Sequence, residues 1–139
     1  MKYLAFVIIL ISSFAHSEEW YIGKWEVVDA KFPGISAMGM SEAKLWFGDI
    51  ASYTTSEISF RGDICTSPTL QKTEFSEDEF YSYYRASFQQ LDISGKSVDV
   101  LKVQCENNSG VVAAGLISTN NGFVYTLWDG VFFKLKSVP

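Results

Sequence analysis

The stretch "NGFVYTLWDGVFFKLK", residues 121–136, indicates the fold more clearly than any other part of the chain. Asn-Gly and Asp-Gly are strong signals for a two-residue β-hairpin turn, because such turns need residues that tolerate a positive φ. Asn121-Gly122 opens the stretch and Asp129-Gly130 divides it into two apolar, aromatic runs. The sequence therefore predicts an antiparallel meander with strands at residues 123–128 and 131–136.

Short apolar runs separated by turn residues continue upstream of this meander, and their aromatic and β-branched content favours strands. One helix is expected at residues 42–47, because Ser41 is a suitable N-cap and Gly48 a suitable stop. Residues 75–84 are ambiguous, since Ser76 is a possible helix cap while the aromatic residues that follow favour a strand. The other expected strands cover residues 21–30, 50–54, 58–60, 66–75, 85–93, 97–105 and 111–118. The fold class that follows is mainly β, an antiparallel β-barrel of about 8–10 strands with one short helix near the N-terminus, because closure removes exposed sheet edges.

The N-terminus has the pattern of a secretory signal peptide. Lys2 supplies a positive charge, residues 4–14 are largely apolar, and Ala15-His16-Ser17 fits the small-x-small cleavage rule. The apolar run is short for a membrane span, so no stable membrane anchor is expected. We therefore expect residues 1–17 to be a signal peptide and residues 18–139 to form a single domain that is periplasmic or secreted.

Cleavage at this point changes the available chemistry, because His16 is the only histidine in the chain. A mature chain without imidazole excludes Ser-His-Asp and Cys-His catalysis and any histidine-ligated metal site. Loss of Lys2 leaves ten of the eleven Lys and Arg against sixteen Asp and Glu, a formal charge of −6. Such a charge argues against nucleic-acid binding, which needs a basic surface, and suits a basic partner. We expect no cofactor, no metal and a monomer.

Cys65 and Cys105 are the only cysteines. Two lone cysteines behind an export signal are expected to form a disulfide, because extracytoplasmic compartments are oxidising. A redox pair would normally have C-x-x-C spacing, and a metal site would need further soft ligands.

Gly23-Lys24-Trp25 lies on the first strand expected in the mature chain. This Gly-x-Trp, followed by a helical segment and a run of antiparallel strands, resembles the calycins, which comprise the lipocalins and their fatty-acid-binding relatives. The resemblance implies a calycin-like β-barrel across residues 18–139, with Trp25 as the barrel-floor residue and Gly23 as its spacer. It also implies a small apolar ligand inside the barrel. The high aromatic content leaves open whether that interior is hollow or filled by side chains.

A second resemblance is to the periplasmic inhibitors of C-type lysozyme. These are small disulfide-bonded barrels with a Ser-Gly loop and a later aromatic-x-Gly hairpin, and Ser109-Gly110 and Trp128-Asp129-Gly130 occur here in that order. The resemblance implies binding of a cationic wall hydrolase. Asn107-Asn108-Ser109, in the same expected turn, is a formal N-glycosylation sequon that matters only in a eukaryotic protein.

The acidic run Glu77-Asp78-Glu79 is expected to be a solvated surface rather than a catalytic pair, because acid–base catalysis needs a carboxyl group in a pocket. The sequence thus predicts a binding protein and no enzyme. The sequence favours a calycin-like protein that binds a small apolar ligand inside a hollow barrel. The alternative is an inhibitor or immunity protein that binds a cationic extracytoplasmic enzyme, such as a lysozyme-like hydrolase, or a toxin at its surface. The candidate partner surface comprises Glu77, Asp78, Glu79, Ser109, Gly110 and Trp128.

Overall fold

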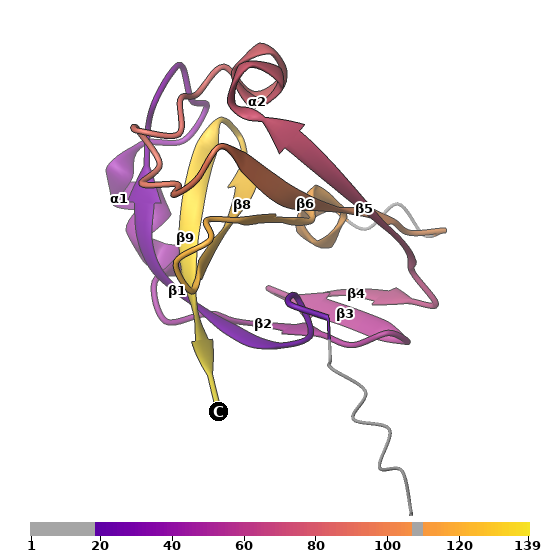
Figure 1. Cartoon of the computed structure of the whole chain (residues 1–139). Coiled ribbons are helices and arrows are strands. Elements are labelled where there is room, and N and C mark those ends of the chain that lie inside the picture. Colours follow the sequence, from indigo (N-terminus) through magenta and orange to yellow (C-terminus); the bar gives the residue numbers. More distant parts are fainter. Residues whose placement is uncertain (1–18, 107–109) are drawn as a thin grey trace, which may run out of the picture.

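The computed structural model describes residues 19–106 and 110–139, which form one curled antiparallel sheet with two short α-helices (Figure 1). The strands are β1 (Gly23–Lys31), β2 (Ile50–Tyr53), β3 (Glu57–Phe60), β4 (Asp63–Thr66), β5 (Thr69–Ser76), β6 (Ser97–Gln104), β7 (Leu116–Ser118), β8 (Phe123–Trp128) and β9 (Val131–Val138). The helices are α1 (Met40–Ala43) and α2 (Glu77–Tyr84), and two 3₁₀ turns are η1 (Lys44–Trp46) and η2 (Val111–Ala114). The expected mainly β, barrel-like class is confirmed, and α2 adds a second helix to the one expected.

The order of strands across the sheet explains its curvature. It runs β4-β3-β2-β1-β9-β8-β7-β6-β5, so the two edge strands, β4 and β5, are consecutive in the chain. Only Ser67 and Pro68 separate them. Three Cα-to-Cα steps hold Thr66 within about 11 Å of Thr69, so the sheet has to bend until its edges meet at this corner. Beyond the corner β4 and β5 diverge without pairing, which makes the sheet a half-barrel (Figure 1).

The expected disulfide is confirmed, and it lies at the same corner. Cys65 in β4 is bonded to Cys105, the residue after β6, with a Cα–Cα distance of 5.7 Å. Both cysteines are buried in the core. The bond therefore joins the β4 edge of the sheet to the β5–β6 edge.

Successive residues of a strand point to opposite faces, and both faces of this sheet carry a buried cluster. The inner cluster gathers residues from every part of the curl, including Trp25, Tyr53 and Phe133. The outer cluster lies between β5–β9 and the segment that begins with α2, and includes Phe80, Tyr125 and Phe132. Large rings fill the inner face: Trp46 stacks on Phe133 with centroids 4.1 Å apart.

Trp25 belongs to the inner cluster and is 6% exposed. Its indole Nε1 donates a hydrogen bond of 3.0 Å to the carbonyl oxygen of Tyr21. Gly23 has a φ of +136°, and a side chain there would meet nothing within 4 Å. Gly23 is therefore suited to its position by backbone conformation and not, as the resemblance implied, by a need for space.

The two hairpin signals behave differently. Asp129 and Gly130 both have positive φ, at 52° and 81°, as the expected two-residue turn requires. In the preceding hairpin the positive φ values fall at Asn120 and Gly122, so the connection is longer than the two-residue turn expected at Asn121-Gly122. The Asn120 side chain stabilises this longer loop by donating to the carbonyl oxygens of Ser94 and Ser97.

Residues 85–93, expected to form a strand, instead fold as a series of turns. The backbone amide of Ser87 donates to Gln90 Oε1, and the amide of Gln90 donates to Ser87 Oγ. These reciprocal bonds favour a turn, while Phe88 and Leu91 are buried in the outer cluster. The alternation of buried and exposed residues at the start of this segment resembles that of a strand. The expectation was wrong because the segment has no neighbouring strand to pair with in the described part of the chain.

The strand expected at residues 111–118 is also shorter than predicted. Residues 111–114 form η2, and only Leu116–Ser118 pair as β7. Gly115 between them has a φ of +71°, and a Cβ there would lie 2.1 Å from the carbonyl oxygen of Leu101. This close approach to β6 breaks the strand. Near the N-terminus, α1 is capped by Gly39 without a side-chain bond, in place of the expected Ser41.

Removing the disulfide should destabilise the protein markedly. Its 40-residue separation corresponds to about 4 kcal/mol of loop-closure entropy, so the Cys65→Ala/Cys105→Ala double variant should lose up to about that free energy of unfolding. Urea denaturation of the variant and of the reduced native chain measures it, and the two should agree. An unchanged midpoint in both would contradict the closure role assigned to this bond.

Truncating Trp25 should also be costly. Trp25→Ala should lower the free energy of unfolding by about 3–5 kcal/mol, the usual range for a buried ring. Leu45→Ala is the control, because Leu45 is 75% exposed and should change stability little. Thermal denaturation of both variants checks this, and equal melting temperatures would show that the indole is not a core residue.

Candidate functional site

The candidate site is built around α2, whose start is determined locally. Ser76 is the N-cap: its Oγ accepts from the backbone amide of Glu79, and the Glu79 carboxylate accepts from the amide of Ser76. This reciprocal capping box overrides the strand preference of the aromatic residues that follow. The helix ends at Arg85, which has left-handed φ and donates its amide to the carbonyl oxygen of Tyr81.

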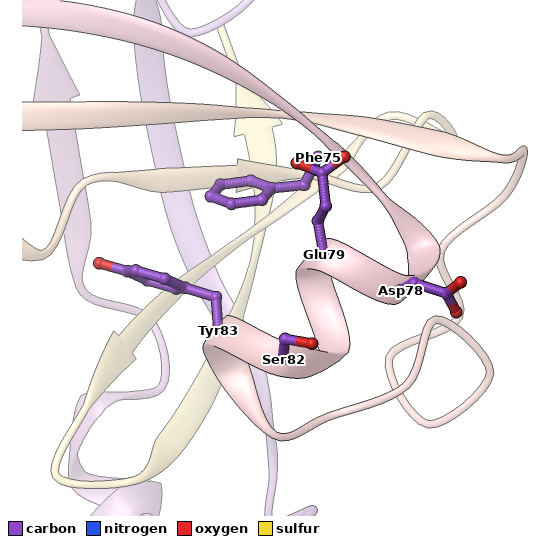
Figure 2. A pocket seen from close by; sticks show the side chains of 5 residues that line it. All are labelled: Phe75, Asp78, Glu79, Ser82 and Tyr83. Carbon is purple, nitrogen blue, oxygen red and sulfur yellow. The ribbon is translucent and has the colours of Figure 1, made fainter.

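Helical spacing separates the side chains of α2 into two sets. Phe80 is completely buried in the outer cluster. On the other side, Glu79 and Tyr83 lie one turn apart and close to Phe75 of β5, and the Phe75 and Tyr83 ring centroids are 5.5 Å apart. Figure 2 shows these two rings side by side, with Glu79 pointing toward Phe75 and Asp78 pointing away.

These residues surround an open hollow of about 440 Å³, lined by Phe75, Asp78, Glu79, Ser82 and Tyr83 (Figure 2). Tyr83 is 61% exposed and its neighbour Tyr81 is 53% exposed. Exposed aromatic rings beside carboxylates can hold a cation in two ways, by ion pairing and by contact with the ring face. The hollow therefore has the chemistry of a site for Lys or Arg side chains.

Two further hollows continue from the first across β6. One of about 350 Å³ shares Tyr83 with the first and is otherwise lined mainly by apolar residues of β6, η2 and β8. Another of about 230 Å³ shares Lys102 and Val103 with the second and extends to Thr69 and Gln71 of β5. We call these three adjoining hollows the α2 groove.

Lys102 is the cation within the α2 groove. Its Nζ lies 5.3 Å from the centroid of the Tyr83 ring and 5.9 Å from that of Phe75. The rings of Phe75 and Tyr83 thus already lie near one cation of the chain itself, Lys102 of β6. The carboxylates of Asp78 and Glu79 form no ion pair with Lys or Arg among the described residues.

The tyrosines beneath the groove are unsuited to proton transfer. Burial, with a contribution from Tyr83, raises the pKa of Tyr84 well above its ordinary value, and burial does the same for Tyr125. Both hydroxyls therefore stay protonated at neutral pH. Tyr125 Oη is buried without a hydrogen-bond partner among the described residues, which marks it as core rather than as a proton donor.

The structure places the expected surface residues on two different parts of the sheet. Glu77, Asp78 and Glu79 form the first turn of α2, above the outer cluster. Trp128 packs against the inner cluster, where a Cβ on Gly110 would lie 3.5 Å from its ring. Gly110 and Trp128 thus lie close together, away from the outer cluster that α2 covers. Ser109 and Asn107 lie outside the described residues.

Sequence reasoning missed Phe75, Ser82, Tyr83 and Lys102 as groove residues. Two of them, Ser82 and Tyr83, had a signal, because Ser76-Glu77-Asp78-Glu79 has the S-x-x-E pattern of a capping box. A helix from residue 77 places Glu79 and Tyr83 on one side, with Asp78 and Ser82 adjacent. Lys102 had no local signal, since it reaches the rings only through the pairing of β6 with β5.

Within residues 19–106 and 110–139, no cluster of three or more His, Cys, Asp or Glu side chains is arranged to hold a metal ion. Neither α-helix of the described segments is long and apolar enough to span a bilayer. Comparisons of the chain with protein-family models, curated proteins and solved structures found no match. Function therefore has to be argued from the geometry of this molecule.

Proposed function

We propose that the protein is an exported, non-enzymatic binding protein that binds a basic protein at α2 and at the hollow of about 440 Å³ beside it. The observation that carries the proposal is the exposed ring of Tyr83 beside the acidic residues Asp78 and Glu79 around that open hollow. Of the two hypotheses raised by the sequence, this favours the surface-bound partner.

The inner face supports this choice. Trp25, Trp46, Tyr53, Phe60 and Phe133 are all less than 10% exposed and belong to one packed cluster that also holds the disulfide. A barrel of this size has room for its own side chains or for one small ligand, but not for both. The three hollows described above all lie on the other side of β6, at α2 and the outer face.

Only one of the three carboxylates in the first turn of α2 takes part in capping the helix. Glu79 completes the capping box, and an acidic first turn is favourable beside the positive end of the helix dipole. Glu77 and Asp78 take part in no ion pair or side-chain hydrogen bond among the described residues, and both are exposed. Their charge is available to a basic partner, which it would attract over a distance at low salt.

Exposed tyrosines strengthen the case for a protein partner. Tyrosine is enriched at the centres of protein interfaces because its ring buries much area and loses little conformational entropy. Tyr81 and Tyr83 stand on the same helix as the carboxylates. A partner that presents Lys or Arg beside apolar surface would match both features.

The compartment completes the proposal. A buried disulfide is consistent with an exported protein, since such bonds persist in oxidising compartments. We place the protein in the periplasm or outside the cell, as a monomer after removal of residues 1–17. A cationic wall hydrolase or toxin is the class of partner that such a site suits.

A small apolar ligand is a second candidate, favoured by one observation. Six of the nine residues that line the hollow of about 350 Å³ are apolar: Val100, Leu101, Val103, Ala113, Ala114 and Leu127. This volume falls within the range of small-molecule pockets. The ligand of the calycin resemblance would then bind outside the sheet.

Reversing the free charges of α2 should weaken binding to a basic protein. A C-type lysozyme is a suitable probe, and Glu77→Lys/Asp78→Lys should raise its Kd by about tenfold or more, because attraction is replaced by repulsion. Calorimetric titration at low and high salt measures this, and the native interaction should weaken at high salt. Glu42→Lys is the matched control, since Glu42 is an exposed acid in the first turn of α1. Equal losses in both variants would contradict a site on α2.

Filling the apolar hollow should separate the two candidates. Ala114→Trp places a large ring in the hollow of about 350 Å³ and should abolish any binding of an apolar fluorophore. It should leave the salt-dependent binding of the basic probe nearly unchanged, because Ala114 is not among the residues that line the hollow of about 440 Å³ beside the α2 carboxylates. Fluorophore binding that persists in Ala114→Trp would exclude this hollow as the ligand site.

A further inference from the structure

The strand that leads into α2 is an open edge. β5 pairs with β6 over all eight of its residues, from Thr69 to Ser76, and occupies the end of the sheet order. In the described chain it has a strand partner on one side only. An antiparallel strand directs the N–H and C=O groups of every second residue away from its partner, so about four residues of β5 present backbone donors and acceptors on the open side.

Of the usual devices that protect an edge, β5 has charged side chains, Lys72 and Glu74, but neither a bulge nor an internal proline. The register with β6 runs without a bulge, and the only nearby proline, Pro68, comes before the strand begins. The links to β4 all lie at the Thr69 end: the Ser67-Pro68 connection and the disulfide from Cys65 to Cys105. Toward Ser76 and α2 the edge of β5 separates from β4 and stays open (Figure 1).

The charges along β5 indicate what fits beside it. Glu74 is directly opposite Asp99 of β6, and two like charges in such a pair repel each other. Lys72, two residues away on the same face, is held by Glu19 at 2.9 Å. Glu74 has no ion pair among the described residues, so a cation on its open side would lie beside two carboxylates.

The preference of β5 for a basic partner continues into α2, which follows it directly in the chain. β5 ends at Ser76, and the next residues are Glu77 and Asp78 in the first turn of the helix. An antiparallel strand laid along β5 therefore begins beside these carboxylates. The residue opposite Phe75, next to the one opposite Glu74, points to the outer face that α2 covers, so a second cation at this position is directed to the α2 side of the sheet.

We propose that an extended basic segment of the partner protein adds to β5 as a further antiparallel strand, with one Lys or Arg opposite Glu74 and another beside the first turn of α2. The inference rests on the proposed function and specifies how the partner is held. Backbone hydrogen bonds to the open edge supply register, and the carboxylates select basic side chains. The hollow beside α2 then receives the part of the partner that precedes this segment.

The test uses a fluorescent threonine-rich peptide of about ten residues with two adjacent lysines, so that one lies on each face of a strand. Two further versions carry N-methyl groups on one or the other alternate set of amides. Only one set faces β5 in an added strand, so one version should bind at least about tenfold more weakly and the other should bind like the parent peptide. Fluorescence anisotropy with the oxidised mature chain measures all three. Equal binding by the two N-methylated versions would overturn strand addition, because attraction between charges alone does not distinguish them.

Protein variants separate this inference from the proposed function. Glu74→Lys should weaken peptide binding about tenfold, while Glu57→Lys, on an exposed position of the internal strand β3, should not. Circular dichroism should show that both variants keep the native sheet.

If Glu74→Lys binds normally while the α2 reversal abolishes binding, edge addition fails and the α2 site stands. If neither variant changes binding, the proposed function fails as well. Sedimentation that shows a dimer dissociated by Glu74→Lys would overturn the inference by assigning the edge to a second copy of the chain.

Discussion

The connection between β4 and β5 is the constraint on which the rest of this molecule depends. Two residues join the strands at opposite ends of the sheet order, so the nine strands cannot lie as an open, gently twisted sheet. The sheet has to bend until its edges meet at one corner, and the Cys65–Cys105 bond makes that meeting covalent. Because both links lie at the same corner, the edges remain apart elsewhere. The filled inner face and the open edge of β5 are two consequences of one connection.

The curvature of the sheet determines which aromatic side chains are buried on its inner face and which remain exposed on the outer side. Bending brings Trp25, Trp46 and Phe133 together on the inner face, and their rings occupy the space that a carrier protein would leave for its ligand. Arg61 completes the packing there, with its guanidinium 4.2 Å from the centroid of the Trp46 ring and an ion pair to Asp49. The exposed rings and free carboxylates are then found on α2, which covers the outer face. This distribution supports the proposal of contact with another protein surface.

Local signals were sufficient for much of the fold. Asp129-Gly130 specified its turn because both residues tolerate positive φ, and two cysteines in an oxidising compartment had only each other to pair with. The errors arose where a distant residue decides the outcome. The strand expected at residues 111–118 is interrupted because Gly115 lies against the carbonyl of Leu101, a contact that no local pattern contains. The groove is similar: Tyr83 and Lys102 meet only because the register of β6 on β5 brings them together. For α2, the capping box was visible, but aromatic residues suit a strand equally well, so its surface was not foreseen as helical.

The position of β9 has a consequence for how the chain folds. Val131–Val138, close to the C-terminus, lies between β1 and β8 and pairs with both. β1 can pair early with β2, but its other neighbour, β9, lies more than a hundred positions later in the chain. Pairing across such a separation is slow, because the entropy of loop closure is lost before any contact compensates for it. Without β9 the sheet would be divided between β1 and β8, so the two parts of the native sheet are joined only when this strand docks.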